Sequence, residues 1–257
     1  MHWVIQNNLY NEDGFTRLID ALVKMDIPHS IHKVIPFVRE LYPDIDPDGK
    51  VVVMGSYSMS YIAQARGWTP GTFLNENFEF IKQVVHWDRM LNDDAWLGPL
   101  RFATVFDEPM FIRPTNDGKS FAGTVMDAYE LEAWKRQILA LDSEDCPTVT
   151  GDTRVMVCRK KKIYNETRCW IVDEKVVTGS VYKVGTRVIC DSHVRKGVIK
   201  FAEKQARIWS PHRAYVMDVA DTPEGLKIIE VNNLNSSGFY AADVQKLVFA
   251  IEEAFNN

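Results

Sequence analysis

Three oxygen-bearing side chains near the end of the chain could hold a metal ion. The residue pattern predicts a β-hairpin with strands at residues 215–219 and 226–231. Asp218 ends the first strand, Glu230 lies near the end of the second, and Asn232 follows at i+2 on the same side as Glu230. Carboxylate and amide oxygens in this number suit Mg²⁺. Glu230 follows an apolar run, where an unpaired carboxylate costs free energy. A hairpin whose acids face water is the alternative; we favour the metal site because the spacing D-(x11)-E-x-N also fits a wider pattern.

A second group of residues could bind phosphate. Residues 111–123 read FIRPTNDGKSFAG, in which a strand delivers Arg113 and a loop between glycines carries Lys119 and Ser120. Backbone N–H groups in such a loop, together with two cations, can hold a phosphate group. An ordinary surface turn has the same composition, so this segment does not identify a site by itself.

Two further segments are rich in cations. Residues 159–168 read RKKKIYNETR, and a run of lysines is most often a solvated face. Between His193 and Arg213 there are six Lys or Arg residues against one acid. Four of them follow helical spacing along one stripe: Lys196, Lys200, Lys204 and Arg207. A solvated helix face explains the stripe, and so does contact with a phosphate backbone, which keeps RNA among the possible partners.

The elements that must position these residues begin with an α/β lobe. Strands are predicted at residues 2–6, 30–37 and 50–54, and helices at 13–25 and 56–66. Strands that alternate with helices at this spacing favour a parallel sheet. No G-x-G-x-x-G follows the first strand, so a dinucleotide site is not supported there.

The rest of the chain has the pattern of an α+β body with antiparallel strands. Helices are predicted at residues 78–92, 129–141, 198–209 and 243–255, and strands at 109–114, 154–158, 167–172 and 175–182. The turn at Asp173 and Glu174 joins the last two strands. We therefore divide the chain into a lobe over residues 1–80 and a body over 81–257, with subdomains at about 81–150 and 151–257.

The composition is that of a soluble globular protein. Of the 257 residues, 46% are hydrophobic and 25% charged, and the net charge is −5, which excludes a disordered tail, a collagen-like fibre and a disulfide knot. The four cysteines form no C-x-x-C pair, which disfavours a zinc site or a disulfide framework. The N-terminus does not have the pattern of a signal peptide and no apolar stretch is long enough to cross a membrane, so we expect a cytoplasmic protein without a membrane partner.

Residues 111–123, residues 159–168 and the final hairpin, in this order along the chain, resemble the ATP-grasp superfamily. The resemblance covers about residues 85–245, and its most specific part is the closing D…EVNNLNSSG. It implies an α/β plus α+β fold, in which two α+β subdomains grip ATP behind a small N-terminal parallel α/β lobe. Arg113 and Arg89 stand where many members have lysine, which is most similar to the phage and bacterial clade named for one arginine and two lysines. The resemblance therefore also implies a bacterial or phage-infected host cell.

The resemblance also implies a role for individual residues. The ATP-binding residues would be Arg113, Lys119, Ser120, Arg159, Lys160, Lys161, Lys162 and Glu166, with Glu166 on the ribose. The metal ligands would be Asp218, Glu230 and Asn232, and the catalytic residues Arg113, Lys119 and Arg168. The acceptor would be held by Lys183, Arg213, Ser236 and Ser237. Lys119 and one of Lys160, Lys161 and Lys162 would be the two lysines of the clade. The sequence leaves the choice among these three open.

These roles together predict a Mg-ATP-dependent ligase. Such an enzyme transfers the γ-phosphoryl group to a carboxylate, and an amine or other nucleophile then displaces phosphate. The cofactors would be ATP and Mg²⁺, and the acceptor is not identified by the sequence. An RNA-repair ligase acting on RNA ends, which the clade implies, and a non-catalytic nucleotide- or RNA-binding module are the alternatives. No DNA partner is predicted.

Overall fold

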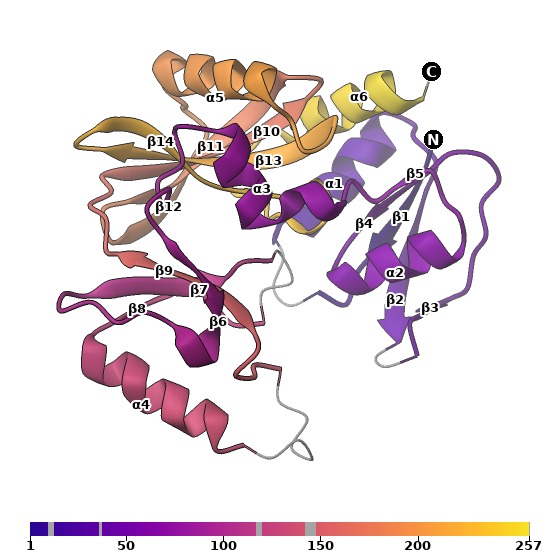
Figure 1. Cartoon of the computed structure of the whole chain (residues 1–257). Coiled ribbons are helices and arrows are strands. Elements are labelled where there is room, and N and C mark those ends of the chain that lie inside the picture. The colour runs from indigo at the N-terminus through magenta and orange to yellow at the C-terminus, as the bar shows by residue number, and fades with distance from the viewer. Residues whose placement is uncertain (10–12, 36–37, 117–119, 142–147, 257) are drawn as a thin grey trace.

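The computed structural model describes residues 1–9, 13–35, 38–116, 120–141 and 148–256. Within these residues the strands form three sheets, each with helices packed on it (Figure 1). The first sheet belongs to an N-terminal α/β lobe, and the other two belong to an α+β body, as the sequence predicts. Among the described residues, no helix is both long and apolar enough to cross a membrane.

The sheet of the lobe has the strand order β3-β2-β1-β4-β5 and is parallel except for β3. Its strands are β1 (His2–Gln6), β2 (His29–Ile35), β3 (Glu40–Tyr42), β4 (Val51–Met54) and β5 (Pro70–Gly71). Trp3 and Ile5 belong to the core shared with α1 (Asp13–Lys24), whereas Val4 packs with residues of α2 (Tyr57–Ala65). Both faces of the sheet are therefore covered at its centre, which explains why β4 is apolar and buried throughout.

The second sheet, called here the central sheet, is antiparallel with the order β12-β11-β10-β13-β14. Its strands are β10 (Asn165–Val172), β11 (Lys175–Val184), β12 (Arg187–Asp191), β13 (Ala214–Thr222) and β14 (Gly225–Asn232). Cys169 packs in a core with α5 (Lys196–Ile208), and Trp170 packs in a core with α6 (Val244–Phe255). Because successive side chains alternate between faces, the even-numbered residues of β10 and β13 face the α6 side.

The third sheet, called here the outer sheet, has the order β6-β9-β7-β8. Its strands are β6 (Trp96–Pro99), β7 (Met110–Pro114), β8 (Thr124–Met126) and β9 (Arg154–Arg159), and α4 (Ala128–Leu139) packs on one face. Asp127 and Glu130 form a capping box at the start of α4. Met110 and Ile112 face α4, so Arg113 projects from the opposite face of β7.

The predicted helix at residues 78–92 is shorter in the structure. The helix α3 covers only Phe80–His86, and Trp87 continues in an extended conformation. The side chain of Trp87 is buried in the core beneath α5, and its indole N–H donates to the carbonyl of Gln205 at 3.0 Å. The following backbone pairs with the edge strand β14, where Leu91 N donates to the Ile228 carbonyl at 2.7 Å. Packing and edge pairing thus replace the last helical turns.

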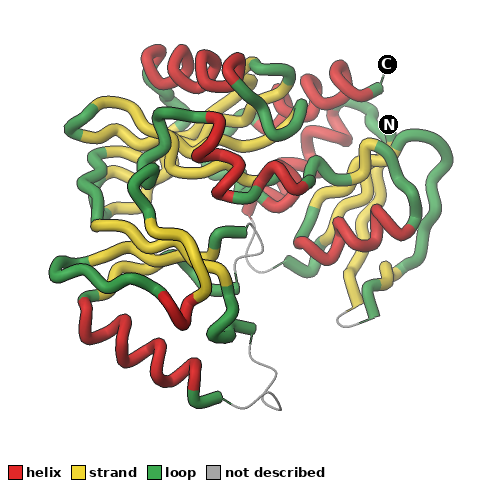
Figure 2. The backbone as a smooth tube through the Cα atoms, in the orientation of Figure 1, coloured by secondary structure: helices red, strands yellow, loops and turns green. Residues whose placement is uncertain are grey.

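A single hydrophobic core joins the lobe to the central sheet. It contains Trp3 and Leu18 from the lobe, Trp170 and Val216 from the central sheet, and Leu247 from α6. Figure 2 shows the helices α1 and α6 lying together between the two sheets. The residue boundaries near 80 and 150 stay predictions, and the lobe is continuous with the body through this core.

Candidate active site

The predicted metal-binding residues lie together at one end of the β13–β14 hairpin. In the register of the two strands, Asp218 lies opposite Glu230 and Val216 lies opposite Asn232. The Asn232 amide Nδ2 donates to Glu230 Oε1 at 3.1 Å and to Asp218 Oδ2 at 3.4 Å. The i, i+2 spacing therefore places the three side chains on one face, as predicted.

Asp218 is the buried acid of the group and is held by Arg168 on the neighbouring strand β10. Arg168 Nε and Nη2 donate to the two carboxylate oxygens at 2.9 Å and 2.8 Å. Burial acts to lower the pKa of Arg168, but the charge of Asp218 and its hydrogen bonds raise the pKa by more, so the guanidinium stays charged. Arg168, predicted as catalytic, is thus a direct partner of a predicted metal ligand.

Glu230 is held by an arginine from the other sheet of the body. Arg113 Nη1, on β7 of the outer sheet, donates to Glu230 Oε2 of β14 at 2.6 Å. The Arg113 guanidinium also lies 5.2 Å from the ring centroid of Phe80. The predicted phosphate-binding arginine therefore reaches the predicted metal site across the gap between the two sheets.

The chemistry of the donor set fits Mg²⁺. Asn232 Oδ1 is buried and has no hydrogen-bond partner among the described residues, so one oxygen at the centre of the group is available to a ligand. Two carboxylates and one amide are a small set, and Mg²⁺ is commonly held by one or two carboxylates together with phosphate oxygens and water. No group of three or more His, Cys, Asp or Glu side chains suited to a metal occurs in the described part of the chain.

A cavity of about 580 Å³ lies between the outer and central sheets and has the size of a nucleotide pocket. Phe111 and Gly123 line it from the outer sheet, and Glu166, Lys183 and Ile229 line it from the central sheet. A Cβ atom on Gly123 would lie 2.6 Å from Phe111 Cζ, so a glycine is required for the close approach of the two segments.

The four predicted ATP-binding cations at residues 159–162 differ in their position relative to this cavity, which is called here the larger cavity. Lys160, Lys161 and Lys162 all line it, whereas Arg159 is exposed and pairs with Glu108 at 2.7 Å. Lys161 Nζ is bound to Asp94 at 2.6 Å, and Lys162 lies over the ring of Tyr164. The side chain of Lys160 has no ion pair or hydrogen bond to any described residue. Of the three lysines, only Lys161 is held by an ion pair with a described residue.

Glu166 lies inside the larger cavity, at the position predicted for the ribose. It accepts hydrogen bonds from Tyr182 Oη at 2.8 Å and from Lys183 Nζ at 2.7 Å. Lys183, predicted as an acceptor anchor, therefore belongs to the larger cavity. Burial, and then the charges of Asp218 and Glu166, raise the pKa of Tyr182 well above its ordinary value, so its hydroxyl stays a donor.

Two tyrosines that the sequence analysis did not select complete the surroundings of Arg168. The rings of Tyr182 and Tyr240 stack with their centroids 5.0 Å apart. The guanidinium of Arg168 lies 5.6 Å from the first ring and 5.1 Å from the second. Alternation along β11 could have placed Tyr182 on this face, but nothing in the sequence marks Tyr240 as its partner.

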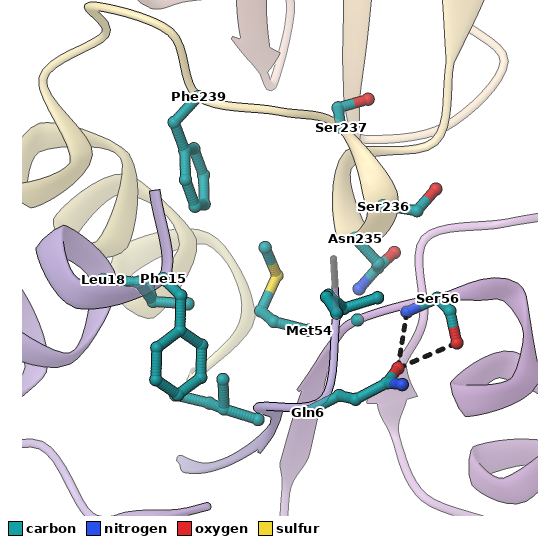
Figure 3. A pocket seen from close by; sticks show the side chains of 12 residues that line it. Gln6, Phe15, Leu18, Met54, Ser56, Asn235, Ser236, Ser237 and Phe239 are labelled. Carbon is teal, nitrogen blue, oxygen red and sulfur yellow. Dashed lines mark hydrogen bonds between the residues drawn. The ribbon is translucent and has the colours of Figure 1, made fainter. Parts of the chain in front are cut away.

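A smaller cavity of about 120 Å³ lies between the lobe and the loop that follows Asn232 (Figure 3). Ser236 and Ser237 line it, and their role in holding the acceptor stays a prediction. From the lobe, Gln6 Oε1 accepts from the backbone N–H and the hydroxyl of Ser56, both at 2.8 Å, and both residues line the cavity.

Among the described residues, neither Arg213 nor Ser120 lines these cavities. Arg213 forms a two-fold ion pair with Asp173, with both distances 2.7 Å, at the β10–β11 turn, and its side chain is 55% exposed. Its role as an acceptor anchor stays a prediction, and its charge is paired at the tip of a hairpin. Ser120 has no hydrogen bond to the described residues, and Lys119 lies outside the described residues.

Two sheets with a lysine-lined cavity between them, and two acids and an amide grouped on one of the sheets, are the arrangement expected of an ATP-grasp protein. The model of an ATP-grasp domain family, the third family in the clade named for one arginine and two lysines, matches residues 28–251, and the chain belongs to this family. No curated protein matches the chain.

Solved structures share the fold over their full length. A RimK domain ATP-grasp protein from Sphaerobacter thermophilus is similar with a TM-score of 0.66 and 13% identity, covering 100% of both chains. A D-alanine–D-alanine ligase from Bacillus anthracis complexed with ATP has a TM-score of 0.62 and 15% identity, covering 98% of this chain and 96% of its own. The ATP-grasp ligase PsnB complexed with a minimal precursor has a TM-score of 0.55 and 11% identity, covering 98% of both. The fold is therefore the ATP-grasp fold.

Proposed function

We propose that the protein is a Mg-ATP-dependent ligase that phosphorylates a carboxylate and joins it to an amine or another nucleophile. Membership in an ATP-grasp family supports ATP-dependent ligase activity as a class. The observation that carries the particular proposal is the position of Asp218, Glu230 and Asn232. Ile229, next to Glu230, lines the larger cavity, and Ser236, four residues after Asn232, lines the smaller one.

The proposed reaction has two steps. An oxygen of the carboxylate attacks the γ-phosphorus, the bond from that phosphorus to the β,γ-bridging oxygen breaks, and ADP leaves. The nucleophile's nitrogen then attacks the acyl carbon, the carbon–oxygen bond to the phosphoryl group breaks, and inorganic phosphate leaves while the nitrogen gives a proton to water. Both steps depend mainly on positioning and on neutralisation of the phosphate charge.

The residues of the site divide between these tasks. Asp218, Glu230 and Asn232 would hold Mg²⁺, which neutralises charge on the phosphate oxygens. Arg113 can release the Glu230 carboxylate and bind the transferred phosphoryl group instead, because a guanidinium binds both carboxylate and phosphate. Lys160 and Glu166 would bind the nucleotide in the larger cavity, and Lys119 keeps the role on the phosphates that the sequence predicts.

The test is turnover of ATP by a Glu230→Ala variant. With Mg-ATP and pooled carboxylate and amine substrates, the wild type should release ADP and phosphate, and the variant should lose at least about 100-fold in kcat, the size expected for one lost stabilising group. Glu174→Ala is the matched control, because Glu174 lies at the β10–β11 turn with Asp173. Normal turnover in Glu230→Ala would contradict the metal assignment.

The identity of the nucleotide product separates the main alternative. An RNA-joining enzyme of the nucleotidyl-transfer type would release AMP, and a non-catalytic module would release neither product. The exposed residues Lys196, Lys200, Lys204 and Arg207 on α5 favour contact with a polyanion. However, α5 packs on the face of the central sheet opposite to α6, away from the face that carries Asp218. A carboxylate substrate is therefore the proposal that the described site supports better.

A further inference from the structure

The smaller cavity has an apolar end and a polar end. Phe15 and Leu18 of α1, Met54 of β4 and Phe239 lie on one side, whereas the side chains of Ser56 and Ser236 lie on the other (Figure 3). We propose that this cavity binds an uncharged aliphatic side chain of the substrate whose carboxylate is phosphorylated. This inference rests on the proposed function and names the substrate class.

Charge limits what the cavity can hold. Among the described residues that line it, the polar groups are amides and hydroxyls, and none is a lysine, arginine, aspartate or glutamate. A charged side chain placed among Ile5, Met54 and Phe239 would lose its hydration and gain no partner of opposite charge. The cavity therefore discriminates against acidic and basic side chains.

The volume of the smaller cavity further limits which side chains it can hold. The volume of about 120 Å³ is close to that of an engineered apolar cavity of about 150 Å³ that binds benzene. A Val, Leu or Met side chain fits a space of this size, and an indole does not. The size of the cavity therefore admits an aliphatic side chain such as that of leucine or methionine and excludes an indole.

The polar end indicates where the carboxylate lies. In the loop that follows Asn232, Gly238 comes directly after Ser236 and Ser237. The Gly238 carbonyl accepts a hydrogen bond from Arg168 Nη1 at 3.4 Å. Arg168 is bound to Asp218, so the polar end adjoins the proposed metal site. A substrate with its carboxylate at this end directs its side chain toward Phe15 and Met54. A free amino acid and the last residue of a peptide share this chemistry.

The first experiment measures binding of amino acids without nucleotide. The probes are leucine, valine, methionine, aspartate, lysine and tryptophan, each free and as the third residue of Gly-Gly-X, titrated by calorimetry into the full chain. We expect at least a 10-fold lower Kd for leucine than for aspartate, whose side chain has nearly the same shape. This result is expected for the free amino acids or for the Gly-Gly-X peptides, whichever of the two series binds. Equal affinities for leucine and aspartate, or no binding in both series, would overturn the inference.

A variant with a cation in the cavity provides the second test. Phe15→Arg should lower the affinity for leucine at least 10-fold and raise that for aspartate, because the new cation pairs with the acidic side chain. Phe102→Arg is the matched control, because Phe102 is exposed on the outer-sheet subdomain. An unchanged preference in Phe15→Arg, with the fold intact by circular dichroism, would overturn the inference. ATP binding is measured separately, and its absence with leucine binding intact would overturn the proposed function alone.

Discussion

The two acids of the proposed metal site are each paired with an arginine, and the two pairs differ in burial. The side chain of Asp218 is 2% exposed and that of Arg168 10%, whereas those of Glu230 and Arg113 are 20% and 15% exposed. Breaking a buried pair on one side leaves an uncompensated charge in a medium of low dielectric. The consequences of a substitution should therefore be largest at Arg168 and Asp218.

Replacing Arg168 with methionine should destabilise the fold by about 3–5 kcal/mol, because Asp218 would stay buried without its partner. The measurement is the free energy of unfolding from urea denaturation. The double variant Arg168→Met with Asp218→Asn removes the charge as well and should recover most of the loss. A single variant that loses less than about 1 kcal/mol would show that water reaches Asp218 and replaces the arginine.

For individual residues, the sequence predicts contacts between side chains that are close along the chain better than contacts between side chains that are distant in the sequence. Glu230 and Asn232 share a strand, and a hairpin brings Asp218 to them, so spacing alone places all three. The positions of Lys183 and Arg213 could not be predicted in this way, because a lone cation carries no signal of the acid that will pair with it. Their partners, Glu166 and Asp173, become visible only through the register of β10 and β11 and the turn between them.

At the scale of elements, the loop after β14 connects the lobe to the proposed metal site. Asn235 Oδ1 accepts from the Phe73 N–H at 2.7 Å, and its Nδ2 donates to the Val53 carbonyl at 2.5 Å. Asn233 Nδ2 donates to Tyr57 Oη at 2.9 Å. The asparagine run therefore serves two purposes, since Asn232 faces the acids while the following asparagines bind the lobe. The sequence motif indicates only the first.

Protonation of His212 should destabilise the junction between α6 and the lobe at acidic pH. Its ring packs beside those of Phe73 and Phe255, with centroid distances of 5.5 Å and 6.2 Å, and its Nδ1 accepts from the Ala214 N–H at 3.1 Å. Burial lowers the pKa of His212 below its ordinary 6.5. Because the unfolded chain then binds the proton more readily, this contribution to stability is complete above about pH 6.5 and is lost as the pH falls below it.

The expected result is a free energy of unfolding that declines between pH 7 and pH 5, measured by denaturant titration at constant ionic strength. His212→Asn keeps an acceptor for the Ala214 N–H and removes the titrating ring, so its decline should be shallower. An equal decline in the variant would assign the pH dependence to other groups, of which His2 is the first candidate because burial lowers its pKa as well.

The elements that the sequence predicts well are those with a long apolar pattern. The strand at His2–Gln6 is predicted residue for residue, and the ends of most helices agree within about two residues. The short strands β3, β5, β6, β8 and β12 were not predicted, because strands of two to five residues at or near a sheet edge carry too few alternating positions. Their pairing depends on neighbours that are distant in the sequence.

At the scale of the whole molecule, the lobe depends on the last helix for its core. Trp3 and Leu18 pack in the same core as Leu247 and Ile251 of α6. The Trp3 indole N–H also donates to Glu252 Oε1 at 2.6 Å. The lobe is thus an α/β unit with one face covered by residues from the opposite end of the chain, which a sequence division near residue 80 does not convey.

Residues 1–80 expressed alone should therefore lack a cooperative thermal unfolding transition, because removal of α6 exposes Trp3, Ile5 and Leu22 to water. Circular dichroism at 222 nm during heating measures this, with the full chain as the reference. A sharp transition in the fragment would show that the lobe folds by itself and that the shared core is an ordinary interface between domains.

The same shared core sets an order of events during synthesis on the ribosome. About 175 residues separate the end of the lobe from the end of α6, which at roughly 5–20 residues per second take about 10–35 s to translate. During that time the nascent lobe lacks the partner that α6 provides for the face carrying Trp3 and Leu18. The growing chain must therefore carry an exposed apolar surface until its last helix emerges, which makes it a natural client for chaperones that act on nascent chains.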